Sequence, residues 1–347
     1  MNFFMSVLGM LLILLPGCSG SVQSQSEFVL GTVCAVSLYD HGSPKIYRKI
    51  FDRLREIENL MSANIEDSDL RRINRASGIE AVKVHPDTIL VLKRALHFAE
   101  LSGGAFDPSV GPLVKLWDIG SGADRVPGEE EIAAVLPLIN WKDIVIDEDA
   151  VTVFLRQPGM CLDLGAIAKG YAADEAAGIV RAAGIKRALI DLGGNILVYG
   201  TKRDGSSWRV GIQNPVESRG AYFGIAEVQN MPPGSGILPG SKTMVTSGVY
   251  ERFFEFDGKR YHHILSTRSG RPVDNGLLSV TVISGSSIDA DALSTALFAL
   301  GYEKGSILAE SLDATEAIFV FADLSVRGTS GAFGYFNLTD GDFTVIQ

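Results

Sequence analysis

An aspartate and a threonine stand four residues apart in the run 289–300, whose composition favours a helix. Residues four apart share a helix face, so the carboxylate of Asp291 and the hydroxyl of Thr295 would lie side by side. They offer hard oxygen ligands to Mg²⁺, which also takes waters, backbone carbonyls and substrate phosphates. The alternative is structural: Asp291 is a first-turn helix charge and Thr295 bonds back to its own helix. Asp289 is expected to be the N-cap.

A glycine-containing turn at 163–170, Asp-Leu-Gly-Ala-Ile-Ala-Lys-Gly, leads into an alanine-rich segment that predicts a helix ending at Gly184. Glycines let backbone amides approach an anion, Lys169 adds a positive charge, and the N-terminus of the following helix favours negative groups. These features are typical of a phosphate site. The alternative is an ordinary strand-to-helix turn with a solvated lysine.

Two adjacent histidines, His262 and His263, lie in a segment that predicts a strand. An imidazole titrates near neutral pH and can act as a general base. Adjacent strand residues point to opposite faces of a sheet, so we expect at most one of these histidines to face a site.

The composition excludes several classes of protein. The chain has 347 residues, of which 46% are hydrophobic, and a net charge of −10, so it is globular and nucleic acid is not expected as a partner. It contains none of the G-x-G-x-x-G, G-x-x-x-x-G-K-[ST], H-E-x-x-H or G-x-S-x-G motifs. Cys34 and Cys161 have no metal-type spacing and nothing local favours a disulfide between them, so we expect both to be buried apolar residues.

Hydrophobic periodicity and turn residues place the candidate residues on a series of short elements. Because no linker divides the chain, we predict one α+β unit with a single mixed or antiparallel sheet and packed helices. A second Asp-Leu-Gly at 191–193 hints at an internal duplication into two intimate halves. The main expected elements are a strand at 28–38, helices at 44–61, 86–102 and 289–300, a stiff loop at 105–113, a hairpin at 144–154, and strands at 187–190, 196–199, 317–321 and 343–347.

The N-terminal segment is expected to be a targeting signal. Residues 5–15 form an uncharged apolar run that is too short to cross a bilayer. The run ends in Leu15-Pro16-Gly17-Cys18, which resembles the lipobox of bacterial lipoproteins. We therefore expect a signal peptide at 1–17, a lipid anchor on Cys18 and a flexible tether at 18–26. The alternative is a simple secretory signal whose cysteine is unmodified.

Taken together, these segments resemble the FAD:protein FMN transferases, the ApbE family of flavin transferases. The resemblance covers nearly all of the chain after the signal peptide, and its ordered series is more specific than any one motif. The segments that carry it are Leu30-Gly31-Thr32, Met61-Ser62, 105–108, 163–170, 191–195, Thr246-Ser247-Gly248, His263-Ile264 and 291–295.

The resemblance implies a flavin transferase catalytic domain at 27–347. Members of the family are exported, often lipidated, and use Mg²⁺ and FAD to place FMN on a threonine or serine of a partner flavoprotein, with AMP as the leaving group. For this chain it implies a lipid-anchored enzyme of the bacterial periplasm, at the inner membrane. The acceptor would be a subunit of a membrane electron-transport complex.

The resemblance also implies roles for individual residues. The metal ligands are expected to be Asp291 and Thr295, with Ser294 as a weaker candidate and the carbonyl of Ala166 as a backbone ligand. The catalytic base is His263, with Asp163 as the alternative, and Lys169 neutralises pyrophosphate charge. The residues expected to contact FAD are Leu30, Ala105, Phe106, Asp107, Asp163, Lys169 and Ile264.

One departure from the family concerns nucleotide retention. The family has an aromatic shortly after Met-Ser, where this chain has Asn64, so a stacking partner for a flavin or adenine ring is absent from that position. An alternative activity keeps the same site but uses water as the acceptor, which gives an FAD pyrophosphatase. A third possibility is a lipoprotein that binds flavin without chemistry, although mere retention of FAD needs no metal.

Overall fold

The computed structural model describes residues 23–122, 125–218, 220–228 and 240–346. The predicted signal peptide and Cys18 lie outside these residues. No helix in the described ranges is both long and apolar enough to cross a membrane.

A nine-stranded sheet forms the centre of the molecule, in the order β1-β2-β6-β7-β10-β13-β14-β15-β17. Neighbouring strands are antiparallel except β15 and β17, which are parallel, so the predicted mixed sheet is confirmed. The strands are β1 (Gln23–Val29), β2 (Thr32–Leu38), β6 (Ala188–Leu192), β7 (Asn195–Tyr199), β10 (Ser241–Gly248), β13 (Leu277–Ser284), β14 (Glu316–Phe321), β15 (Ser325–Gly328) and β17 (Thr344–Val345).

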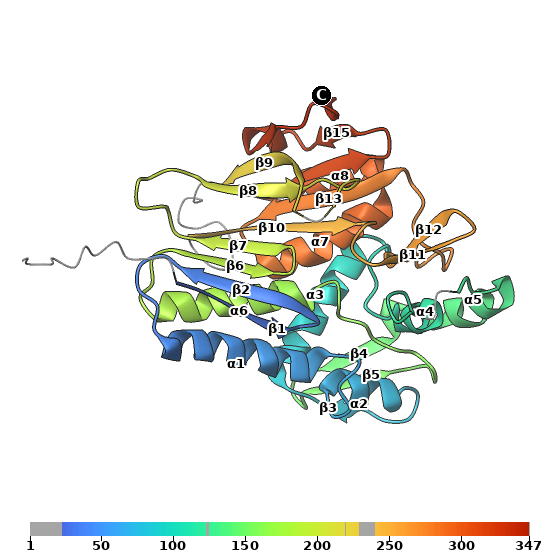
Figure 1. Ribbon diagram of the computed structural model, residues 1–347. Helices are drawn as coiled ribbons and strands as arrows, with labels where there is room; N and C mark the ends of the chain where they lie inside the picture. Colours follow the sequence, from blue (N-terminus) through green and yellow to red (C-terminus); the bar gives the residue numbers. More distant parts are fainter. Residues whose placement is uncertain (1–22, 123–124, 219, 229–239, 347) are drawn as a thin grey trace, which may run out of the picture.

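Helices cover one face of this sheet. They are α1 (Pro44–Met61), α3 (Pro86–Leu101), α6 (Ala168–Ala182), α7 (Ser287–Leu300) and α8 (Tyr302–Glu310). In α1, Ile50, Leu54 and Ile57 recur at helical spacing and are all buried, which is why this amphipathic segment packs inward. Alanines dominate the buried face of α6 and let α7 approach closely. Figure 1 shows α1 and α6 below the strands and α7 beside them.

A small sheet covers part of the opposite face. It has the order β16-β9-β8, with β8 (Trp208–Gln213), β9 (Tyr222–Val228) and β16 (Phe336–Leu338). Residues alternate along the large sheet, so Val282 packs with the helices while Ile283 packs against the small sheet. The central sheet therefore separates two of the three hydrophobic clusters found among the described residues.

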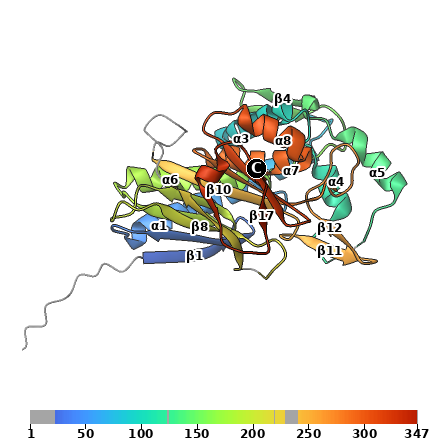
Figure 2. The same ribbon diagram turned by 90° about the horizontal axis from the view of Figure 1, so that it is seen from above.

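The remaining elements gather around one end of the central sheet. Figures 1 and 2 both place α4, α5 and the β11–β12 hairpin there. These elements are α2 (Asp69–Arg75), α4 (Gly111–Trp117), α5 (Glu129–Val135), the sheet β3-β5-β4 (Val82–Lys83, Thr152–Leu155, Ile144–Asp147), β11 (Phe253–Phe256), β12 (Lys259–His262), and the short 3₁₀ turns η1 (Leu136–Leu138) and η2 (Trp141–Asp143). The 3₁₀ turn η3 (Ala332–Gly334) lies instead beside β14 and β16.

Three predictions for segments in the N-terminal half of the chain were wrong. The strand expected at 28–38 is a hairpin, because Leu30 and Gly31 adopt left-handed φ angles of 57° and 68° and reverse the chain. Pairing with β2 extends β1 back to Gln23, so residues 23–26 of the predicted tether belong to the sheet. The predicted loop at 105–113 ends earlier, because α4 begins at Gly111 with proline in its first turn.

Two further predictions are corrected by the structure. The N-cap of α7 is Ser286, and Asp289 lies in the first turn, where it pairs with Arg94. The first Asp-Leu-Gly precedes a helix, whereas the second forms a β-hairpin between β6 and β7, so the short repeat marks no repeated supersecondary structure. Cys34 and Cys161 are buried and unpaired, as expected.

Candidate active site

A cavity of about 720 Å³ opens where the loops beyond β1, α1 and α3 meet the N-terminal parts of α6 and α7. This volume is typical of a ligand pocket. The predicted site residues that line it are Leu30, Asn64, Ala105, Phe106, Asp107, Asp163, Ala166, Lys169, His263, Ile264, Asp291 and Thr295. Ser294 lies outside this lining.

The two expected side-chain metal ligands lie on the cavity side of α7. Asp291 is buried, and its Oδ2 accepts a hydrogen bond from the backbone N–H of Gly170 at 2.8 Å. Burial raises the pKa of its carboxyl, while the positive charge of Lys169 acts in the opposite direction. The hydroxyl of Ser247, on β10, lies 3.2 Å from Thr295 Oγ1.

Ser294 lies beside the two expected metal ligands and does not line the cavity itself. Its hydroxyl donates to the carbonyl of Asp291 at 2.9 Å and lies 2.9 Å from Ser247 Oγ. The hydroxyl is therefore held by the chain, and its link to Thr295 runs through Ser247. Sequence reasoning named the Thr-Ser-Gly segment that contains Ser247 but gave it no role.

The donor set fits Mg²⁺. Within the described residues, no group of three or more His, Cys, Asp or Glu side chains could hold a metal ion. The cavity instead offers one carboxylate, the hydroxyl of Thr295 and the backbone around Ala166, which are hard oxygen donors. Mg²⁺ commonly binds through one or two carboxylates and completes its shell with waters and substrate phosphates.

The turn at 163–170 forms the cavity wall next to Asp291. Asp163 Oδ1 accepts from the N–H of Gly165 at 2.8 Å, which shapes the turn, and Lys169 Nζ donates to the carbonyl of Gly165 at 3.3 Å. Lys169 lies in the first turn of α6, so its ammonium and the helix N-terminus both face the same region. The structure thus brings together the parts of the predicted anion site.

One histidine faces the cavity, as predicted. His262 is buried, and its Nε2 lies 2.9 Å from the carbonyl of Val273. His263 lines the cavity, and its Nδ1 lies 3.2 Å from the carbonyl of Arg252. Burial and the neighbouring Arg252 cation lower the pKa of His263 to about 3. Because a carbonyl only accepts, Nδ1 of the neutral ring carries the proton and Nε2 keeps a lone pair.

Asp107 supports its own loop. Its Oδ1 accepts from the N–H and the hydroxyl of Ser109, at 2.8 and 2.6 Å, and its Oδ2 accepts from the N–H of Trp141 at 3.0 Å. Burial raises the pKa of this carboxyl. The carboxylate therefore holds the loop that carries Ala105 and Phe106 on the cavity wall.

Asn64 lies exposed on the cavity rim, in a turn after α1. Its backbone N–H donates to Ser62 Oγ at 3.2 Å, and the hydroxyl of Ser68 closes the same turn on the carbonyl of Ser62. The side chain of Asn64 is therefore left on the rim while its backbone and neighbouring serines shape the turn.

Sequence reasoning missed three charged residues of the lining: Glu58, near the end of α1, and the neighbours Glu251 and Arg252. Glu251 and Arg252 follow β10 in a turn with no periodic pattern. Arg252 matters because its carbonyl orients His263 and its cation lowers the pKa of that histidine. Arg252 and His263 stand at the two ends of the β11–β12 hairpin, which brings them together.

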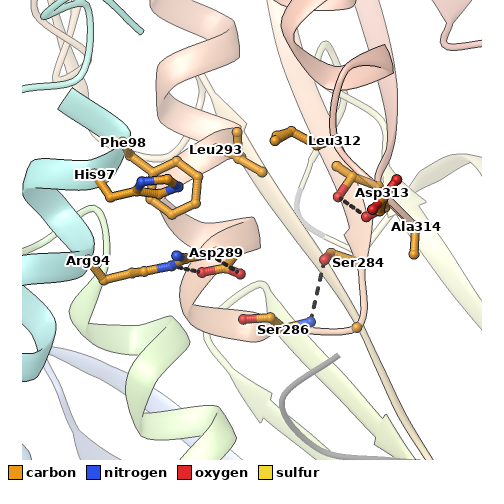
Figure 3. A pocket seen from close by; sticks show the side chains of 12 residues that line it. Arg94, His97, Phe98, Ser284, Ser286, Asp289, Leu293, Leu312, Asp313 and Ala314 are labelled. Atoms are coloured by element: carbon orange, nitrogen blue, oxygen red, sulfur yellow. Dashed lines mark hydrogen bonds and ion pairs between the residues drawn. The ribbon is translucent and has the colours of Figure 1, made fainter. Parts of the chain in front are cut away.

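A second cavity of about 300 Å³ lies between α3 and α7 (Figure 3). Arg94 donates to both carboxylate oxygens of Asp289, at 2.5 and 2.7 Å. The guanidinium charge is thus already neutralised, and all the predicted metal and nucleotide residues lie elsewhere. The larger cavity is the candidate active site.

Comparisons with known proteins identify the family of this chain. Residues 30–319 match the model of the ApbE family. A protein of Klebsiella pneumoniae called FAD:protein FMN transferase is 37% identical over 326 residues, covering 94% of this chain and 98% of that protein. A protein of the same name from Treponema pallidum is 36% identical and covers 97% of each chain.

Solved structures give the same result. The flavin transferase ApbE from Vibrio cholerae superposes with a TM-score of 0.78 at 30% identity, over 90% of this chain and 99% of that one. The ApbE protein of Thermotoga maritima superposes with a TM-score of 0.80, also at 30% identity and the same coverage. The chain belongs to the ApbE family.

Proposed function

We propose that this protein is a Mg²⁺-dependent FAD:protein FMN transferase, which moves FMN from FAD to a threonine or serine hydroxyl of a partner flavoprotein and releases AMP. The observation that carries the proposal is the meeting of Asp291, Thr295, Lys169 and His263 on one cavity. Relatives of this name that cover nearly the whole chain support it.

Each of the site residues has a distinct part in this proposed reaction. Asp291, Thr295 and the carbonyl of Ala166 would hold Mg²⁺, which neutralises charge that grows on the pyrophosphate. Lys169 adds a second positive charge at the start of α6. The positive end of the α6 dipole, which follows the turn at 163–170, would attract the phosphates to the same place.

His263 accepts the proton of the acceptor hydroxyl. Its Nδ1–H is held by the carbonyl of Arg252, so Nε2 is the basic atom. As that proton leaves, the hydroxyl oxygen forms a bond to the phosphorus of the FMN half, and the bond from this phosphorus to the oxygen of AMP breaks. AMP leaves with the electron pair. The negative pyrophosphate raises the proton affinity of the imidazole above that in the free pocket.

We further propose that the protein is lipid-anchored through Cys18 on the periplasmic side of the bacterial inner membrane. The support is the lipobox-like sequence Leu15–Cys18. β1 begins at Gln23, so only a short segment would separate the anchor from the folded domain. An acceptor subunit of a membrane electron-transport complex would then be within reach.

The test is incubation of the purified protein with FAD and Mg²⁺, with and without a candidate acceptor, followed by measurement of AMP and of the acceptor mass. Transfer predicts AMP together with an acceptor heavier by one FMN. AMP without a mass increase would identify an FAD pyrophosphatase, and bound FAD without AMP would identify a flavin-binding protein. Asp291→Asn should abolish both products, whereas a variant that retains them would refute the metal assignment.

A further inference from the structure

A buried carboxylate in the middle of α6 has no part in the proposed reaction. Asp174 is 8% exposed and lies outside the cavity lining. Its two oxygens accept from the N–H of Ser287 at 3.0 Å each, and Oδ2 also accepts from the N–H of Ile288 at 2.9 Å. These are the first two amides of α7, which have no acceptor within their own helix.

The cap of α7 is thus supplied by another helix. The natural N-cap residue, Ser286, makes no side-chain cap, and its hydroxyl has no hydrogen-bond partner among the described residues. Asp174 takes over that role from α6, with a negative group at the positive end of the α7 dipole. The hydroxyl of Ser287 adds a link to the sheet by donating to Asn195 Oδ1 at 2.8 Å.

A second bond joins the same two helices one turn away. The N–H of Gly170 donates to Asp291 Oδ2 at 2.8 Å. Gly170 and Asp174 are four residues apart on α6, and Ser287 and Asp291 are four apart on α7, so each pair shares a helix face. Hydrogen bonds at two places one turn apart fix both the rotation and the sliding of α7 against α6.

The hydrogen bonds of Asp174 and Gly170 connect the two helices that carry the candidate active-site residues. α6 begins with the turn that carries Lys169, and α7 carries Asp291 and Thr295. We propose that Asp174 is a positioning residue for metal binding, which holds Asp291 and Thr295 in place against the Lys169 turn by capping α7 from outside the cavity. This inference rests on the proposed function, because it assumes that these two residues bind Mg²⁺.

The test compares Asp174→Asn with Asp69→Asn. Asp69 is a matched control: it is 4% exposed, and its Oδ2 accepts from the N–H of His85 and the hydroxyl of Thr88, both at 2.7 Å, at the start of α3. Mg²⁺ affinity is measured by calorimetry with ADP present, since ADP supplies adenine and two phosphates but no FMN to transfer. ADP affinity is measured separately in EDTA.

We expect Asp174→Asn to weaken Mg²⁺ binding by about 10- to 100-fold, as is typical when a group behind a metal ligand is changed. ADP affinity in EDTA should stay at the wild-type value, and Asp69→Asn should lower the melting temperature without changing Mg²⁺ affinity. Wild-type Mg²⁺ affinity in Asp174→Asn, or equal losses in the two variants, would overturn the inference. If the wild-type protein binds no Mg²⁺ with ADP, the metal part of the proposed function fails as well.

A measurement on the wild-type protein covers the case in which Asp174→Asn does not fold. Amide hydrogen exchange is followed with and without Mg²⁺ in the presence of ADP. Because the cap and the ligands share α7, metal binding should slow exchange at the amides of Ser287 and Ile288 and leave those at the start of α3 unchanged. Unchanged exchange at Ser287 and Ile288 on metal binding would contradict the positioning role.

Discussion

At the scale of single residues, one carbonyl decides the chemistry of His263. The carbonyl of Arg252 accepts a hydrogen bond from the Nδ1–H of His263, so the lone pair of the ring is on Nε2. Its neighbour His262 is turned to the carbonyl of Val273 and is buried. These two adjacent histidines therefore have different surroundings: His262 is buried against Val273, and His263 faces the cavity.

The loss of folding stability at acid pH can be used to test whether His263 is neutral in the folded protein. Its pKa is lowered to about 3 in the folded protein by burial and by Arg252, while the unfolded side chain titrates near 6.5. Between these values the unfolded state binds more protons, so His263 makes the protein less stable as the pH falls below about 6.5 and has no such effect above it. His263→Gln should therefore lose less melting temperature on acidification than the wild type.

The control for this measurement is His41→Gln, at an exposed histidine, which should keep the wild-type dependence. Equal losses of stability in His263→Gln and the wild type between about pH 6.5 and pH 4 would show that the ring is not held neutral.

Asn64 tests nucleotide retention. Stacking of a base on an aromatic ring is worth about 1–3 kcal/mol, so Asn64→Tyr should tighten FAD binding by roughly ten- to a hundredfold and slow AMP release without an acceptor. Calorimetry and an AMP assay check both effects. Asp67→Tyr places the same ring nearby but off the cavity lining, and should change neither. If Asn64→Tyr also leaves both unchanged, Asn64 is an ordinary turn residue.

At the scale of elements, the approach of α6 to α7 depends on one glycine. A Cβ on Gly170 would lie 2.2 Å from the carbonyl oxygen of Ser287 and 2.7 Å from Asp291 Cβ. Backbone cannot move aside as a flexible side chain can. The two helices that carry Lys169 and the proposed metal ligands therefore touch at a point where no side chain fits.

Gly170→Ala should destabilise the fold by about 1–3 kcal/mol through overpacking and should also weaken Mg²⁺ binding, because α7 must shift. The matched control is Gly178→Ala in the same helix, where nothing lies within 4 Å of the added Cβ. That variant should be more stable by about 0.5–1 kcal/mol. Urea unfolding and Mg²⁺ calorimetry separate the two, and a stabilised Gly170→Ala would show that the helices are free to adjust.

At the scale of the whole molecule, the small sheet and the candidate active site lie on opposite faces of the central sheet. The small sheet β16-β9-β8 and its core lie on one face of the central sheet. The helices lie on the other face, and the cavity lies between the N-terminal parts of α6 and α7 and the loops that follow β1, α1 and α3. The edge strand β1 leads directly from the N-terminal segment to the hairpin turn at Leu30, on the cavity rim.

Localisation is tested on the full chain. Cys18→Ser should remove the lipid and move the protein from the membrane fraction to the soluble fraction, as fractionation and mass spectrometry would detect. Transferase activity should be retained, because Cys18 precedes the sheet. A matched Cys34→Ser change, at a buried thiol, should leave the membrane fraction unchanged. An unmodified Cys18 in protein that still partitions into membranes would refute the anchor.

Features that depend on near neighbours in the chain could be predicted from the amino-acid sequence. The helical spacing of Asp291 and Thr295, the helix at 44–61, the hairpin at 144–154 and the turn at 163–170 follow from side-chain periodicity and local turn chemistry. The order of short motifs also indicated the family, which the comparisons confirm.

Which of these segments come into contact depends on the tertiary structure. The cap from Asp174 to α7, the link from Ser247 to Thr295 and the orientation of His263 by Arg252 join residues whose contact depends on how strands pair and helices pack. Such contacts leave no period in the sequence, because a polar side chain that bonds across the fold looks the same as one that bonds to water. Burial and the partners brought by the fold assign each side chain its role.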